Sequence, residues 1–423
     1  MAIKRRGKSP SSLPHAVTFL SDNSLLRQKP FLRFWLARIN AAAANQMLTV
    51  AVAWQVYQLT GSAMDLGLVG LCQFLPRLLL TATAGNMADS HDRKRIAVLA
   101  QMLQCLTLGA LLLLTLTDTI SRHWIFLLVA VSGTARAFDM PATSALLPRL
   151  VEGNQLSKAV ALSASAMQAA FIIGPALGGL LYAFGATTVY GVTLALFIFA
   201  TFTFQALPPQ PPLMAGQPGG EWQKFIDGLA FIRSQKVVLG AISLDMFAVL
   251  FGGATSLMPI IAEELLHTGA WGLGLLRSAP AVGALVMSFW LARHPLDKRV
   301  GHILFVSVAI FSFATIGFGL STHLGLSLAI LALLGAADMV SVVIRGSLVQ
   351  LQTPDHMRGR VSAVNSIFIG ASNQLGEFES GVTAAWFGAV PAVILGGVLS
   401  LGVTVCWMIW FPQLRKAESL QGH

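Results

Sequence analysis

Charged side chains are scarce in this chain of 423 residues. Asp, Glu, Lys and Arg together make up 11% of it, whereas hydrophobic residues make up 55%. A soluble globular domain carries about 25% charged residues. The chain therefore lacks the polar surface that water requires, and a lipid bilayer is its expected surroundings.

Cysteine is also scarce, and its placement excludes several kinds of site. Cys72, Cys105 and Cys406 are isolated within apolar stretches and show no paired spacing, which argues against a disulfide framework or a zinc site. The sequence has no nucleophile elbow, metal-ligand cluster or nucleotide-binding glycine loop in a credible context. We therefore expect no enzyme activity, no metal, no cofactor and no ATP-driven transport.

Long apolar runs fill almost the whole chain. A helix needs about 20 apolar residues to cross a hydrocarbon core of about 30 Å. The expected spans of the first half are 31–59, 65–88, 96–117, 124–147, 158–183 and 186–206. Those of the second half are 237–262, 270–292, 301–321, 325–347, 358–386 and 390–411. The sequence predicts an all-α polytopic membrane protein with twelve transmembrane helices in two six-helix bundles.

A proline-rich and glycine-rich segment at 207–236 separates the two halves. It begins with Pro208 and Pro209 and ends in an amphipathic stretch around 222–232, which predicts a linker followed by a helix on the membrane surface. The expected units are an N-terminal tail at 1–30, bundles at 31–206 and 237–411, and a C-terminal tail at 412–423.

The chain is basic, with 28 Lys and Arg against 18 Asp and Glu. These cations lie at the ends of the apolar runs and form no separate patch, so we expect no nucleic acid partner. Five of the 28 fall deep inside the spans and only Arg122 falls on the side away from the termini. The remaining 22 fall on the side of the termini and linker, when the cations at the first three positions of a span are counted there. The positive-inside rule makes that side the cytoplasm. We expect a multi-pass inner-membrane protein with both termini cytoplasmic.

A weak internal repeat relates the two halves at an offset of 203 residues. It aligns Glu152 with Asp355, Gly178 with Gly381, and Gly185 with Gly388. A duplicated six-helix unit is the expected source, and such repeats place a substrate site at their interface.

Residues 85–95 form a basic connection between the second and third spans, which we expect to be a tight turn. It resembles the signature loop of the major facilitator superfamily, in the residues Gly85, Asp89, Arg93, Lys94 and Arg95. It departs from that pattern at Met87, Ser90 and Asp92. In the family, the aspartate and the cations form a latch that closes the cytoplasmic side. The alternative is a positive-inside loop with an incidental aspartate.

Two further stretches resemble parts of the same superfamily. Gly174, Pro175, Gly178 and Gly179 are similar to the signature of its drug-type antiporters, although glycine-mediated helix packing is an alternative. The stretch 353–361 looks like a loop-to-helix signature of the enterobactin-exporter-like branch, and that resemblance extends over nearly the whole chain. It implies the major facilitator fold and efflux of a siderophore or a drug.

Ionisable residues inside the expected spans are functional candidates, because burying a charge in lipid is costly. The candidates for the substrate cavity are Arg38, Arg77, Arg136, Asp139, Asp338 and Arg345. The repeat places Arg136 at a depth similar to that of Asp338, so the two could face each other. A salt bridge between Arg136 and Asp139 is the alternative. Arg277 is similarly buried and could bind an anion or pair with a glutamate.

Three carboxylates are candidates for carrying a proton. Asp245 lies about 13 Å into its span, near the midplane, and has no obvious local partner. Glu377 and Glu379 are second choices, and they point to different faces of one helix. Packing against polar neighbours such as Asn373 is their alternative role.

The sequence thus predicts a secondary active transporter. The resemblance favours proton-coupled antiport that exports a siderophore or amphipathic drug-like small molecule by alternating access. We expect a monomer whose partners are this substrate, protons and the lipid bilayer. An importer or flippase for a metabolite or lipid-like substrate, working without a proton gradient, remains the alternative.

Overall fold

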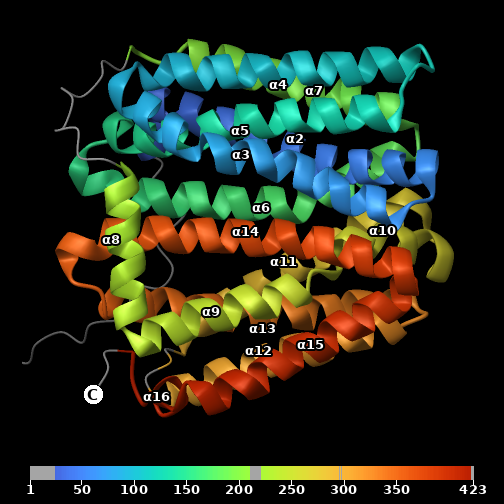
Figure 1. Ribbon diagram of the computed structural model, residues 1–423. Helices are drawn as coiled ribbons and strands as arrows, with labels where there is room; N and C mark the ends of the chain where they lie inside the picture. The colour runs from blue at the N-terminus through green and yellow to red at the C-terminus, as the bar shows by residue number, and fades with distance from the viewer. Residues whose placement is uncertain (1–23, 210–220, 295, 297, 421–423) are drawn as a thin grey trace, which may run out of the picture.

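The computed structural model describes residues 24–209, 221–294, 296 and 298–420, and over these residues its regular structure is helical. The expected N-terminal tail falls mostly outside the described residues, as does the middle of the expected linker. Long helices lie side by side, and their connections gather at two ends (Figure 1). We call the end with α8 (Glu221–Ser234) the linker end and the opposite one the far end.

The first half comprises the helices up to Gln205. They are α1 (Ser24–Arg27), α2 (Lys29–Thr60), α3 (Ala63–Ser90), α4 (Arg93–Leu116), α5 (Arg122–Leu150), η1 (Gly153–Gln155), α6 (Leu156–Tyr182) and α7 (Ala186–Gln205).

The second half follows α8. Its helices are α9 (Lys236–Phe251), η2 (Ala254–Leu257), α10 (Met258–Ile260), η3 (Ile261–Leu265), α11 (Gly269–Arg293), α12 (Val300–Leu320), α13 (Leu324–Leu351), α14 (Asp355–Phe387), α15 (Ala389–Trp410) and α16 (Pro412–Arg415).

Ten helical segments of the described chain are long and apolar enough to cross a membrane. Helices α2 and α14 are also long, at 32 and 33 residues, but carry more polar side chains. Both pack within the bundle, α2 against α6 and α7, and α14 against α3 and α9. Their polar side chains can therefore face protein, where they cost less than in lipid. Ten of the expected twelve crossings are thus supported by length and hydropathy. Helices α2 and α14 are long enough to be the other two, and the count of twelve stays a prediction.

The expectation of one continuous helix over 237–262 is wrong. Helix α9 ends at Phe251, and the chain continues through the short turns η2, α10 and η3. The break falls at Gly252 and Gly253, and a Cβ added at Gly253 would lie 2.6 Å from the backbone of Gly376 in α14. Paired glycines weaken the helix here and allow α14 to approach its backbone.

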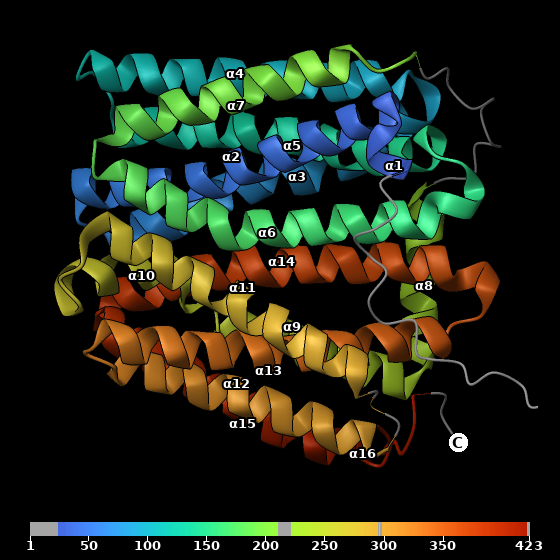
Figure 2. The ribbon, with the colours of Figure 1, turned by 180° about the vertical axis from the view of Figure 1, so that it is seen from behind.

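The two halves lie on either side of an interface in which α3 packs on α14 and α6 packs on α11 (Figures 1 and 2). Towards the far end these helices are in backbone contact. A Cβ at Gly67 would lie 3.2 Å from Cα of Gly381, and one at Gly179 would lie 2.9 Å from Cα of Gly274. Tyr57 of α2 also donates a hydrogen bond to Glu264 of η3 at this end. The halves are therefore closed against each other at the far end.

The internal repeat is visible in the turns that follow α6 and α14. Gly185 has φ of 99° and Gly388 has φ of 90°, and each is the residue before the next long helix. Side chains rarely tolerate this backbone region, so glycine is required at both positions. The same turn geometry at the same offset supports a duplicated unit.

Candidate functional site

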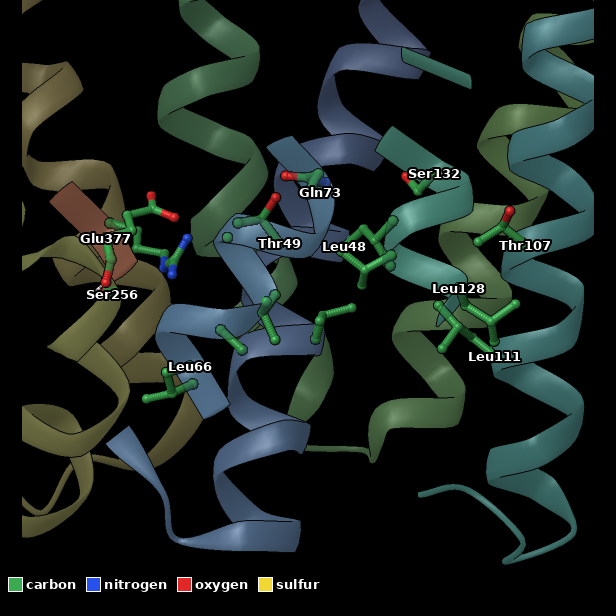
Figure 3. A pocket seen from close by; sticks show the side chains of 16 residues that line it. Leu48, Thr49, Leu66, Gln73, Thr107, Leu111, Leu128, Ser132, Ser256 and Glu377 are labelled. Atoms are coloured by element: carbon green, nitrogen blue, oxygen red, sulfur yellow. Dashed lines mark hydrogen bonds between the residues drawn. The ribbon is translucent and has the colours of Figure 1, made fainter. Parts of the chain in front are cut away.

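A cavity lies where the two halves meet. Most of its lining comes from α2, α3, α4 and α5, and the second half contributes Ser256, Arg277 and Glu377. Figure 3 shows Glu377 and Ser256 on one side and Leu111 and Leu128 on the other. The cavity thus has a charged side formed by the second half and an apolar side formed by the first half.

This cavity is small in the present conformation. Its volume is about 50 Å³, and a water molecule needs about 10–15 Å³ on this measure. It has room for a few waters. A larger solute would need the helices around it to separate.

Arg277 and Glu377 form a charge pair at the edge of this cavity. Arg277 of α11 interacts electrostatically with Glu377 of α14, whose carboxylate also takes a hydrogen bond from Thr255. The Nε atom of Arg277 is buried and has no hydrogen-bond partner in the described structure. A Cβ added at Gly70 of α3 would lie 2.6 Å from Oε2 of Glu377. The pair therefore faces the first half directly, with an unused donor beside it.

Glu379 has a different environment from Glu377. Its carboxylate accepts a hydrogen bond of 2.8 Å from Thr383, one turn along the same helix, and it does not line the cavity. This agrees with the expectation that the two glutamates point to different faces of α14.

Four of the predicted cavity residues come together in the first half. Asp139 interacts electrostatically with Arg38 and Arg136 and accepts a hydrogen bond of 2.9 Å from Gln101. Arg77 lies within electrostatic reach of Arg136. Two guanidinium groups thus lie near one carboxylate and a third lies near Arg136, so this cluster carries net positive charge. It lies outside the lining of the interface cavity.

Asp245 has no partner close to it in the chain, as expected, but it is not a lone carboxylate. Its carboxylate forms an ion pair with Arg345 of α13, and the two side chains are only 8% and 6% exposed. The partner could not be identified from the chain because it comes from another helix. The expected approach of Arg136 to Asp338 is not observed as an ion pair, and the electrostatic neighbours of Arg136 are Asp139 and Arg77.

Asp338 and Asp245 line a second, smaller cavity within the second half. Ser307 of α12 and Ser341 of α13 line it as well. Asp245 and Asp338 therefore lie together at a place distinct from the interface cavity, which Glu377 lines.

The residues of the predicted latch lie mainly in helices. The expected turn over 85–95 is wrong, because α3 continues to Ser90 and α4 begins at Arg93. Arg93 is buried and donates hydrogen bonds to the carbonyls of Ala88 (2.9 Å) and Ala145 (3.3 Å). It thus joins the start of α4 to α3 and α5. The Asp89 side chain lies outside what the structure describes, so a latch remains a prediction.

Asp92, one of the departures from the family pattern, caps α4. Its side chain accepts a hydrogen bond of 2.9 Å from the amide of Lys94, and an N-terminal cap of this kind stabilises a helix. The Lys94 ammonium donates in turn to the carbonyl of Leu207 (2.6 Å). Asp92 therefore stabilises the start of α4, although it departs from the family pattern.

The glycines of the α6 motif mediate close helix packing. A Cβ at Gly178 would lie 2.8 Å from Cα of Met47 in α2, and Gly179 meets α11 of the second half. Gly174 lies against Gln46 of α2. These contacts support the alternative of glycine-mediated helix packing. At Gly179 the packing is between the two halves.

Sequence reasoning missed the uncharged polar residues of the interface cavity. Thr49, Gln73 and Ser256 line it, yet nothing in their sequence context distinguishes them from residues that pack elsewhere. Ser256 points inward because the α9 helix is broken just before it. The paired glycines at 252 and 253 indicate a weak point in the helix, but they do not identify Ser256 as a cavity residue.

Long apolar helices, two halves related by a repeat and a charged cavity between them define a multi-pass membrane transporter of the major facilitator type. The chain belongs to the transmembrane secretion effector family, whose family model matches residues 20–422. The family and the similar proteins described next are transporters.

Named relatives cover almost the whole chain. It is 29% identical over 402 residues to the enterobactin exporter EntS of Citrobacter koseri, covering 91% of this chain and 94% of that protein. It is 28% identical over 409 residues to EntS of Shigella boydii serotype 18, covering 94% and 96%. The similarity thus extends through both halves.

Solved structures share the fold at low identity. A mutant of the nucleoside transporter NupG has a TM-score of 0.71 at 14% identity, covering 90% of this chain and 99% of that one. A bacterial homologue of the iron transporter ferroportin has a TM-score of 0.68 at 18% identity, covering 93% and 100%. These likenesses establish the major facilitator fold.

Proposed function

We propose that this protein is a proton-coupled exporter of a siderophore or amphipathic drug-like small molecule. It works as a monomer in the inner membrane, with both termini cytoplasmic, and the halves at 31–206 and 237–411 rock about the cavity between them. The observation that carries this proposal is the Arg277–Glu377 pair, which the second half presents to an apolar pocket of the first half.

The proposed cargo combines an apolar or aromatic body with an acidic group. Leu111 and Leu128 offer apolar contact at one side of the cavity, and Arg277 offers a planar fork of donors at the other. Catechols and related ring-bearing acids have this combination. The relatives named as enterobactin exporters support the same class of cargo.

Glu377 is the proposed proton carrier among the three carboxylates. It lines the cavity and interacts with Arg277, so its protonation would release Arg277 to bind an acidic cargo. Asp245 and Glu379 do not line this cavity, which makes them second candidates. Protonation of Glu377 and binding of cargo to Arg277 would then be coupled, as antiport requires.

Alternating access is proposed because the cavity is too small for such a cargo as it stands. Opening at the linker end would enlarge it towards the cytoplasm, while the glycine contacts at the far end keep that side closed. The reverse motion would release the cargo on the other side. In this scheme Arg93 and its neighbours act as the latch of the linker end.

The test measures accumulation of catecholate siderophores and dyes in cells with and without the protein, each with and without a protonophore. We expect expression to lower accumulation and the protonophore to restore it. Glu377→Gln should abolish this gradient-driven export, whereas Glu379→Gln, the matched control on the same helix, should retain it. Export by Glu377→Gln at the normal rate would remove Glu377 from coupling. Increased uptake on expression would instead favour an importer or flippase.

A further inference from the structure

The small cavity of the second half has the composition of an ion site. Its polar lining consists of two carboxylates, Asp245 and Asp338, and two hydroxyls, Ser307 and Ser341, and the rest is apolar. Its volume is about 10 Å³, which matches the space of about 10–15 Å³ that one water molecule requires. A single ion of similar size would fit, and an organic solute would not.

Three helices bring these oxygens together. Asp245 comes from α9, Ser307 from α12, and Asp338 and Ser341 from α13. Asp338 and Ser341 are three residues apart, so they share one face of α13. Arg345, four residues further along the same face, holds Asp245 in place through the ion pair.

The buried hydroxyl of Ser341 is an independent observation that points to a ligand. Ser341 is only 3% exposed, it lines the cavity, and its Oγ has no hydrogen-bond partner in the described structure. An unsatisfied buried polar atom is destabilising, and native structures contain few of them. Ser307, which is 4% exposed, adds a second hydroxyl oxygen to the same wall.

The charges around the cavity leave one negative charge unbalanced. Asp245 and Arg345 neutralise each other. Asp338 makes no ion pair and no hydrogen bond with any other described residue. One monovalent cation would neutralise it. A proton would do so through Asp338 alone, without using either hydroxyl, whereas a hard cation uses several oxygen ligands at once.

We propose that Asp245, Asp338, Ser307 and Ser341 form a binding site for a sodium ion. The bound ion ties α9, α12 and α13 together within the second half. This site is separate from the Arg277–Glu377 cavity, and the proposal does not depend on the proposed export function.

The experiment measures the apparent melting temperature of the purified full-length protein in detergent, in sodium, potassium or choline chloride at equal ionic strength. A ligand that binds only the folded state stabilises it in a saturable way. We expect sodium to raise the melting temperature by a few degrees more than potassium or choline does. The shift should saturate with sodium concentration.

Two variants and a control make the test specific. Asp338→Asn removes the unbalanced charge, and the milder Ser341→Ala removes one oxygen. Both should lose the sodium-specific shift, and Ser347→Ala on the same helix should keep it. Equal shifts in all three salts, or a sodium shift retained by both variants, would overturn the proposal. So would a melting temperature that responds to pH but not to sodium, because a proton alone would then neutralise Asp338.

Discussion

Removing one partner of the buried pair between Asp245 and Arg345 should destabilise the second half strongly. The side chains are 8% and 6% exposed, so water cannot solvate the charge that remains. Breaking a buried pair from one side costs about 3–5 kcal/mol, whereas replacing both partners is often nearly neutral. At about 2 °C per kcal/mol for a large chain, Asp245→Asn should lower the melting temperature by about 6–10 °C.

The assay is a double-mutant cycle followed by thermal unfolding in detergent. Asp245→Asn and Arg345→Gln should each be destabilising, and the double variant should recover most of the lost stability. Such non-additivity identifies a direct interaction. The reasoning is refuted if the double variant is as unstable as the sum of the single ones, or if Asp245→Asn unfolds at the normal temperature.

The same variants separate a structural role of Asp245 from a role in proton transfer. Asp245→Asn should abolish pH-driven transport on either account. If the double variant recovers both stability and proton-driven transport, Asp245 acts through its pairing alone. If stability returns and transport does not, Asp245 itself carries the proton, and Glu377 loses its place as the first candidate.

Two further predictions concern helix contacts. Gly335→Ala should destabilise the protein by about 1–3 kcal/mol, because the added Cβ would clash with the backbone carbonyl of Pro280 in α11. Gly346→Ala on the same helix places its Cβ in open space and should leave the stability unchanged. Thermal unfolding of both variants tests this. Tyr57→Phe removes the hydrogen bond between halves at the far end. It should therefore raise the rate at which a maleimide that enters from the far end labels a cysteine introduced at Leu66 in the cavity. Tyr182→Phe, whose hydrogen bond stays within the first half, is the control and should leave that rate unchanged. An unchanged rate in Tyr57→Phe would show that this bond does not hold the far end closed.

The positions of the long helices were predictable because an apolar run of membrane length has few alternative structures to a membrane-spanning helix. For example, the run expected at 186–206 is the helix Ala186–Gln205. The break after Phe251 was not predicted, because paired glycines in an apolar run are also common in unbroken membrane helices. The tertiary structure shows the break together with the close approach of α14 at Gly376.

The candidate charges were identifiable one by one, but their partners were not. Burial in an apolar run marks Asp245 and Arg345 as costly residues wherever they lie. Their pairing depends on which faces of α9 and α13 meet, and a periodic pattern does not specify this when almost every face is apolar. The same holds for Arg277 and Glu377, which come from α11 and α14.

The sequence by itself determined that this protein crosses a membrane many times, that its halves repeat, and that charged residues lie inside the bundle. These features follow from local composition, since a bilayer imposes length and hydropathy on each segment separately. The tertiary structure decided which charges meet, where the interface cavity forms, and that two carboxylates and two hydroxyls line a second, smaller cavity. Those outcomes depend on contacts between helices distant in the chain, and glycine positions such as Gly70 set how closely the helices approach.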